Sequence, residues 1–222
     1  MSPAQPDGQP WDPHGVLLPQ LAEASAHRPL SIYVHVPFCQ VRCGYCDFNT
    51  YTVGFGPGAD WVSYDSSALA EMSLSARILS DAQMPARPAS SIFFGGGTPT
   101  LLDPAALARL LDGIRQNFGI APGAEVTVEA NPESVDEAVL ERLREAGFTR
   151  VSFGMQSAVP TVLRTLDRRH DPAKLPGLVV AARQLGLDVS VDLIYGAPGE
   201  SLHDWEVSLR EAIAMEPDHI SA

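Results

Sequence analysis

The sequence has few positive charges: 15 lysine and arginine residues stand against 27 aspartate and glutamate residues, and the formal net charge is −12. A surface of this sign repels phosphate groups, so nucleic acids and anionic membranes are poor partners. No apolar run reaches the roughly 18–20 residues that a membrane-spanning helix needs. The amino terminus has neither the basic region nor the apolar core of a secretory signal. We therefore expect a cytoplasmic protein without a membrane span.

Cysteine is scarce as well: the chain has three, Cys39, Cys43 and Cys46, spaced C-x3-C-x2-C. No second pair follows, although structural zinc sites usually take two separated pairs. Thiolates select zinc, copper(I) or iron–sulfur clusters. A disulfide with one spare thiol is rare in the cytosol. We interpret the triplet as three ligands of a four-iron cluster that leaves one iron open. A zinc site completed by His35 is the alternative.

With 222 residues, of which 45% are hydrophobic, the chain is long enough for one domain with a full core. Residues 1–30 are predicted to be a disordered leader, because they are rich in Pro, Gln and Ala and their prolines interrupt any helix. Residues 31–222 are predicted to form the core domain. The leader prolines are Pro3, Pro6, Pro10, Pro13, Pro19 and Pro29.

Short apolar strands are predicted near residues 31, 91, 125, 150, 188 and 219, with a helix after each of the first five. This alternation specifies an α/β fold in which helices cover a parallel sheet. The last strand, from His219, holds only two or three residues. We expect it to leave an incomplete apolar edge, and therefore poor solubility or dependence on a partner.

Several loops and helix ends are readable from single residues. Residues 54–58 are predicted to be a flexible turn. Asp103 before Pro104 is a typical helix start. Ser134 and Glu137 are predicted to form a capping box, and Gly147 is predicted to end that helix in the left-handed conformation.

The candidate site residues lie at or just past the carboxyl ends of the predicted strands. The cysteines follow the first strand, a triple glycine the second, and Glu129, Gln156 and Asp192 later ones. Parallel α/β folds place their active sites at this edge. The triple glycine, Gly95 to Gly97, either needs a positive φ or allows a close backbone approach to a ligand.

The cysteine spacing, with Tyr45 before the third cysteine, resembles the signature of the radical S-adenosylmethionine (SAM) superfamily. The stretch G-G-G-T-P-T after the second strand supports the resemblance. It implies a partial (β/α)6 barrel with a [4Fe–4S] cluster on Cys39, Cys43 and Cys46. It also implies that SAM binds the open iron and that an electron, from a flavodoxin- or ferredoxin-type donor, splits its sulfonium.

The resemblance covers about residues 31–222 and is strongest to the branch with oxygen-independent coproporphyrinogen III dehydrogenase (HemN type) and the haem chaperone HemW. It implies that Tyr33 lies beside the SAM methionine, Tyr45 against the adenine, and Glu129 on a SAM polar group. The glycine-loop contacts it implies are Gly96, Gly97 and Thr98.

The same resemblance implies a second SAM site at Gln156, Arg168 and Asp192, although Arg168 is equally typical of a solvated cation at a helix end. Asp167 stands where relatives often carry glycine. Phe48 stands where the dehydrogenase pattern has a fourth cysteine, which favours HemW.

The predicted function is therefore handling of haem or porphyrin for transfer to an unknown acceptor, with coproporphyrinogen III oxidation as the alternative. The haem motif of HemW would lie beyond Ala222, so the sequence is interpreted as truncated there. His35 and His170 are candidate haem ligands, although we favour a structural role for each.

Overall fold

The computed structural model describes residues 16–17, 19–53 and 61–222. The predicted turn at residues 54–58 and most of the predicted leader lie outside the described residues. One part of the leader contradicts the prediction that proline prevents helix there: α1 spans Pro19–Ser25. Proline is compatible with the first turn of a helix because the N–H at that position has no helical partner.

The predicted α/β fold with parallel strands is confirmed. A six-stranded sheet has the order β1-β4-β5-β6-β7-β8, and each neighbouring pair is parallel. Within the described residues it is an open sheet with β1 and β8 at its edges. The strands are β1 (Leu30–Val36), β4 (Ala89–Gly96), β5 (Ile120–Ala130), β6 (Arg150–Gln156), β7 (Asp188–Leu193) and β8 (His219–Ser221).

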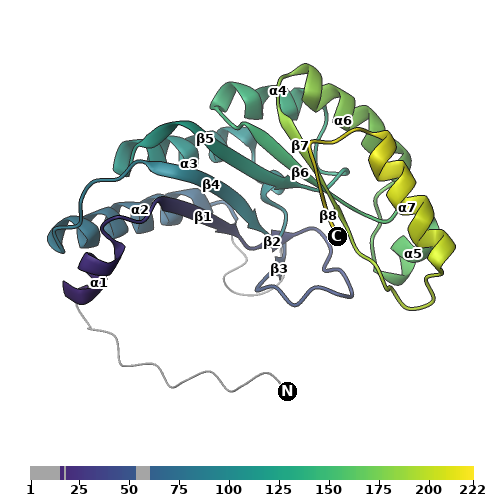
Figure 1. Cartoon of the computed structure of the whole chain (residues 1–222), viewed down its shortest axis with the longest axis horizontal. Coiled ribbons are helices and arrows are strands. Elements are labelled where there is room, and N and C mark those ends of the chain that lie inside the picture. Colours follow the sequence, from purple (N-terminus) through teal and green to yellow (C-terminus); the bar gives the residue numbers. More distant parts are fainter. Residues whose placement is uncertain (1–15, 18, 54–60) are drawn as a thin grey trace.

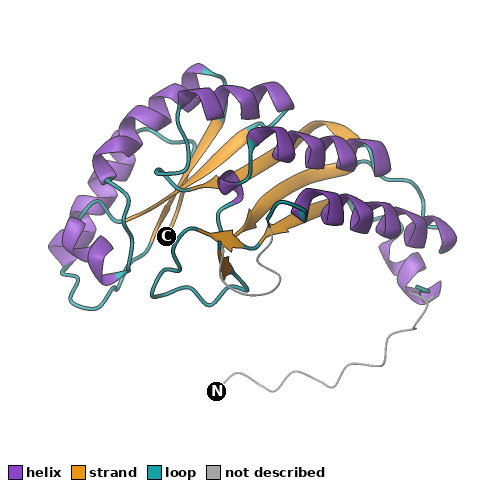
Figure 2. Ribbon diagram, turned by 180° about the vertical axis from the view of Figure 1, so that it is seen from behind, coloured by secondary structure: helices purple, strands orange, loops and turns teal. Residues whose placement is uncertain are grey.

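Helices cover the outer face of this curved sheet (Figures 1 and 2). None of the described helices is long and apolar enough to cross a membrane. Besides α1, the helices are α2 (Tyr64–Asp81), α3 (Pro104–Asn117), α4 (Glu137–Ala146), α5 (Pro160–Thr165), α6 (Leu175–Gln184) and α7 (Leu202–Ala214), with short 3-10 helices η1 (Pro99–Leu101) and η2 (Pro172–Lys174).

The core lies between this helical layer and the sheet. Helix α3 shows how the pattern produces it, because its apolar residues recur at helical spacing. Its side chains at Leu107, Leu110, Leu111 and Ile114 are fully buried. Burying a side chain of this size contributes roughly 1.5–3 kcal/mol each, so the helix is fixed against the sheet.

The predicted caps agree with the structure except at the start of α4. Asp103 caps α3 by accepting a hydrogen bond from the Ala105 N–H, and Gly147 ends α4 with φ +107°. The capping box predicted from Ser134 was wrong, because Asp136 caps α4 and accepts from the Val139 N–H. Ser134 instead hydrogen-bonds the backbone of Asn131 and closes the preceding turn.

A second, two-stranded parallel sheet was not predicted. It consists of β2 (Phe38–Cys39) and β3 (Tyr51–Thr52). The Tyr51 N–H donates to the Pro37 carbonyl over 2.7 Å, and the Val53 N–H donates to the Cys39 carbonyl over 3.0 Å. The pairing joins the two ends of the cysteine-bearing loop, and Figure 1 shows it where the carboxyl ends of the main strands converge.

Candidate functional site

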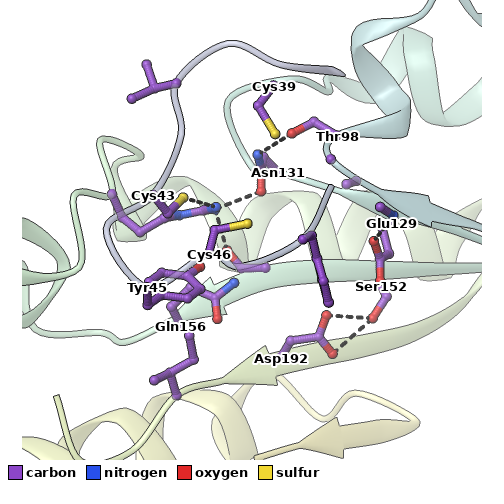
Figure 3. A pocket seen from close by; sticks show the side chains of 18 of the residues that line it. Cys39, Cys43, Tyr45, Cys46, Thr98, Glu129, Asn131, Ser152, Gln156 and Asp192 are labelled. Atoms are coloured by element: carbon purple, nitrogen blue, oxygen red, sulfur yellow. Dashed lines mark hydrogen bonds between the residues drawn. The ribbon is translucent and has the colours of Figure 1, made fainter. Parts of the chain in front are cut away.

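A cavity of about 270 Å³ opens at the carboxyl edge of the main sheet. All of the predicted site residues except Tyr33 line it, including the three cysteines, which are free thiols. Figure 3 shows the labelled cysteines on one side of this cavity and Glu129, Ser152 and Asp192 on another. The topology therefore brings together residues that are more than 150 positions apart in the chain.

The cysteines differ in their surroundings. Cys39 belongs to β2 and is buried, whereas Cys43 and Cys46 lie on the loop after it and are half-buried. Burial raises the pKa of the Cys39 thiol, and the neighbouring Cys46 and Cys43 raise it further. A thiol of this kind is deprotonated when it coordinates a metal. The three cysteines therefore suit a bound metal–sulfur group. A free Cys39 thiolate is disfavoured by its raised pKa.

The structure argues against a single-ion site completed by His35. Its Nε2 lies 2.9 Å from the Asn49 carbonyl oxygen and its Nδ1 lies 3.1 Å from the Tyr33 hydroxyl, so both ring nitrogens have partners. Among the described residues, no three His, Cys, Asp or Glu side chains converge as they would around one ion. Cluster ligands need no such convergence, since each thiolate binds a different iron.

The glycine loop packs against the cysteine-bearing segment. The Gly97 N–H donates to the Val36 carbonyl over 2.8 Å, and the Thr98 N–H donates to the Phe38 carbonyl over 2.7 Å. Gly96 has φ +115°, and a Cβ there would lie 2.6 Å from Nδ1 of His35. The close approach that these glycines allow is thus first of all an approach to the protein's own backbone and side chains.

Two carboxyl groups line the opposite side of the cavity. The register pairs Glu129 on β5 with Ser152 on β6, and Ser152 with Ser190 on β7. Asp192 lies two residues after Ser190. Alternation along a strand therefore puts all three on one face. Sequence reasoning missed Ser152, whose hydroxyl contacts both carboxylate oxygens of Asp192 at 3.0 and 3.1 Å.

Burial governs the protonation of these carboxyl groups. Burial raises the pKa of Glu129 to about 7, the Gly96 N–H that donates to Oε2 opposes this, and the charge of Asp192 adds to it. Burial also raises the pKa of Asp192, against the hydrogen bond from Ser152. A cationic ligand group would stabilise both carboxylates in their charged form.

Arg168 is not the solvated helix-end cation that the sequence allowed. It is 9% exposed, and its Nη2 donates to the Asn131 Oδ1 over 2.7 Å and to the Gly154 carbonyl over 3.1 Å. Its Nη1 lies 3.6 Å from the Cys43 Sγ. Asn131 was also missed, and its position two residues after Glu129 at the end of β5 is the signal that could have indicated it.

The remaining predicted residues occupy the rim or lie nearby. Gln156 ends β6 with φ +61°, a strained conformation for this residue type, next to a register shift. Tyr45 is 40% exposed, and burial of its hydroxyl raises its pKa. Tyr33 is not part of the cavity lining; its ring stacks on Phe93, with centroids 6.1 Å apart.

The other residues of interest near the cysteine loop are His170 and Asp167. His170 is buried outside the cavity lining, and burial, with the charge of Arg168 second, lowers its pKa to about 4. Asp167 has φ +54°, which explains why glycine would suit this position. The chain thus adopts a left-handed conformation just before Arg168 with aspartate in place of glycine.

The family model described as Radical SAM superfamily matches residues 33–212. The chain belongs to the radical SAM superfamily. It is 45% identical over 208 residues to the haem chaperone HemW of Mycobacterium tuberculosis, a match that covers 93% of this chain and 52% of that protein. It is 34% identical over 195 residues to the oxygen-independent coproporphyrinogen III oxidase of Salmonella typhimurium, covering 87% of this chain and 41% of the oxidase.

The solved structures include a radical SAM enzyme with the same arrangement of elements. Coproporphyrinogen III oxidase (HemN) from Escherichia coli matches with a TM-score of 0.77 and 30% identity, over 92% of this chain and 46% of the enzyme. This radical SAM chain spans about half the length of the curated relatives it matches.

Proposed function

We propose that residues 31–222 form a radical SAM domain of a HemW-type haem-handling protein. In this proposal Cys39, Cys43 and Cys46 hold a [4Fe–4S] cluster, SAM binds in the adjoining cavity, and haem or porphyrin is handled for transfer to an acceptor. The observation that carries it is the cavity that all three cysteines share with the carboxyl groups of Glu129 and Asp192. A reduced donor of the flavodoxin or ferredoxin type and a cytoplasmic location belong to the same proposal.

When bound, a three-cysteine [4Fe–4S] cluster supplies one-electron chemistry and an open iron that a ligand can occupy. The protein's own residues would do the rest. Glu129 would accept hydrogen bonds from the ammonium group of SAM, which carries the opposite charge to its carboxylate. The Gly96 N–H holds that carboxylate in place from behind, at 3.1 Å. The half-buried Tyr45 would cover the adenine and limit access of water.

The HemW assignment is favoured over the oxidase by Phe48. This residue stands where the dehydrogenase pattern has its fourth cysteine, and it lies on the rim of the cavity with 60% of its surface exposed. An exposed aromatic ring offers an apolar contact and no sulfur ligand. The higher identity to the M. tuberculosis haem chaperone than to the Salmonella oxidase points the same way.

Coproporphyrinogen III oxidation is the second candidate function, and a specific observation supports it. Gln156, Arg168 and Asp192, the positions expected for a second SAM, line the same cavity as the cysteines. However, Arg168 already makes four contacts within the protein, which leaves fewer of its N–H groups for a ligand.

Anaerobic reconstitution tests the cluster and SAM. We expect about four irons per chain, as the [4Fe–4S] stoichiometry requires, and an electron paramagnetic resonance spectrum of the reduced protein that changes when SAM is added. Serine substitution of Cys39, Cys43 or Cys46 should each abolish the iron. A chain that binds zinc and no iron, or a spectrum indifferent to SAM, would contradict the proposal.

Haem titration and turnover separate the two candidate functions. In a protein with the full length of its HemW relatives, haem should give a saturable shift of the Soret band. Under dithionite and SAM, coproporphyrinogen III should release no carbon dioxide. Carbon dioxide release without haem binding would establish the oxidase instead.

A further inference from the structure

The guanidinium of Arg168 is a buried charge without a carboxylate partner. None of the ion pairs found among the described residues involves it, although its side chain is almost completely removed from solvent. A buried cation is costly unless an anion and hydrogen bonds compensate for it. The two oxygen acceptors of its Nη2 are neutral. Its Nε lies 3.4 Å from Nδ1 of His170, which is also neutral at pH 7 because burial lowers its pKa to about 4. None of these three contacts supplies a compensating negative charge.

The remaining contact of the guanidinium identifies the source of that charge. Nη1 of Arg168 lies 3.6 Å from the Cys43 Sγ, a distance within hydrogen-bond range for sulfur, which is a larger acceptor atom than oxygen. A neutral thiol would accept only a weak bond and leave the cation uncompensated. As a ligand of the proposed cluster, the Cys43 sulfur would bring a negative charge to this position.

Asn131 fixes the direction of this contact. Its Oδ1 accepts from Nη2 of Arg168, and its Nδ2 donates to the Thr98 Oγ1 over 2.9 Å. The labelled side chains of Thr98, Asn131 and Cys43 lie along one side of the cavity in Figure 3. One asparagine thus links the glycine loop to the arginine that faces a cysteine of the proposed cluster.

We propose that Arg168 is a positioning residue that holds Cys43 and raises the reduction potential of the cluster, with Asn131 orienting its guanidinium. The inference rests on the proposed function, because it requires a cluster on Cys39, Cys43 and Cys46.

The direction of the effect follows from charge. One electron from an external reductant makes the cluster more negative by one unit and breaks no bond. A buried cation that donates an N–H to a ligating sulfur stabilises this more negative state, and hydrogen bonds to sulfur and net charge are recognised determinants of cluster potential. Removing Arg168 should therefore make the cluster harder to reduce.

A mediated redox titration of the reconstituted chain, followed by electron paramagnetic resonance, measures the effect. In R168Q we expect the ratio of reduced to oxidised cluster at a fixed potential to fall about tenfold, which is 59 mV for one electron. R168K keeps the charge but cannot reach all four acceptors at once, so its ratio should fall about threefold. N131L, which frees the guanidinium, should shift the ratio in the same direction.

R169Q is the matched control, because Arg169 is the next residue and is exposed. The substitution removes the same charge as R168Q. Its ratio should stay within twofold of wild type, since solvent screens an exposed charge. The inference is overturned if R168Q, R168K and N131L hold the cluster at the wild-type potential, or if R169Q shifts as much as R168Q.

Loss of the cluster in all three variants but not in R169Q would also overturn it, since Arg168 would then serve the fold of the loop alone. Failure of the wild-type chain to bind iron is a separate result, because it contradicts the proposed function itself.

Discussion

A Cβ atom at Gly97 would lie 2.4 Å from the carbonyl oxygen of Phe38. The glycine loop after β4 and the segment that opens the cysteine loop are therefore packed backbone against backbone. A backbone carbonyl cannot turn aside as the end of a long side chain can. The position of the cysteine loop relative to the main sheet depends on this contact, together with the Gly97 and Thr98 hydrogen bonds beside it.

Alanine at Gly97 should separate these two segments. We expect G97A to lower the free energy of unfolding by about 1–3 kcal/mol, the usual cost of forcing extra atoms into a close-packed site. It should also reduce the iron bound after reconstitution, because Cys39 follows Phe38 directly. Urea denaturation of the metal-free chain and iron analysis of the reconstituted chain measure the two effects.

G177A is the control for this substitution. Gly177 lies in the first turns of α6, and a Cβ there would meet nothing within 4 Å. Alanine at such a helical position should raise the free energy of unfolding by about 0.5–1 kcal/mol and leave iron binding unchanged. Equal stability of G97A and G177A would show that the segments are not packed as described.

The strands and the site edge could be predicted from the sequence because both depend on local patterns. Short apolar segments followed by polar or glycine residues mark each strand end, and parallel pairing carries all of these ends to one edge. Glu129 and Asp192 could be identified in this way. The cysteines could be identified as candidate cluster ligands from their spacing alone.

Other features depend on contacts between distant segments and leave no local pattern. Asn131 became a site residue only when Arg168 and Thr98 folded against it. The cap of α4 was misassigned because serine and aspartate both cap helices, and the two stand two residues apart before that helix. Helix α1 was missed because proline was taken as a breaker, whereas it occupies the first position.

Burial of Glu129 predicts an unusual dependence of stability on pH. Its pKa is about 7 in the folded chain, above the ordinary value of 4.5. The folded state therefore binds more protons than the unfolded state between these values, and stability falls as the pH rises from about 4.5 to about 7. The full loss is on the order of 3 kcal/mol.

E129Q should remove this contribution. In the metal-free chain, the variant and wild type should differ little at pH 5, and the variant should be the more stable at pH 8. E141Q, on the exposed side of α4, should keep the pH dependence of wild type. Parallel stability curves for E129Q and wild type, measured by urea denaturation from pH 5 to 8, would refute the assignment.

His35 is expected to fix the loop and not to bind metal. Glutamine at this position keeps an N–H that can reach the Asn49 carbonyl, so H35Q should lose no more than about 1 kcal/mol, the net value of one hydrogen bond. The iron content should stay the same. Loss of bound metal in H35Q, together with zinc in the wild-type chain, would restore the zinc site as the better interpretation.

Asp167 and Gly44 should show coupled effects on stability. A Cβ at Gly44 would lie 2.5 Å from Oδ2 of Asp167, and the Gly44 N–H donates to the Leu166 carbonyl over 3.3 Å, so α5 and the cysteine loop touch here. D167G relieves the left-handed conformation and should raise the free energy of unfolding by roughly 0.5–1 kcal/mol. G44A alone should lower it, because the carboxylate must move.

In the double variant the Asp167 carboxylate no longer stands in the way of a Cβ at Gly44. G44A should therefore lower the free energy of unfolding by less in the D167G background than in wild type. We expect a coupling energy of about 1 kcal/mol from the double-mutant cycle, a value typical of residues in contact. Strictly additive effects would mean that the carboxylate of Asp167 turns away at no cost. The turn before Arg168 would then constrain the cysteine loop through the Leu166 hydrogen bond alone.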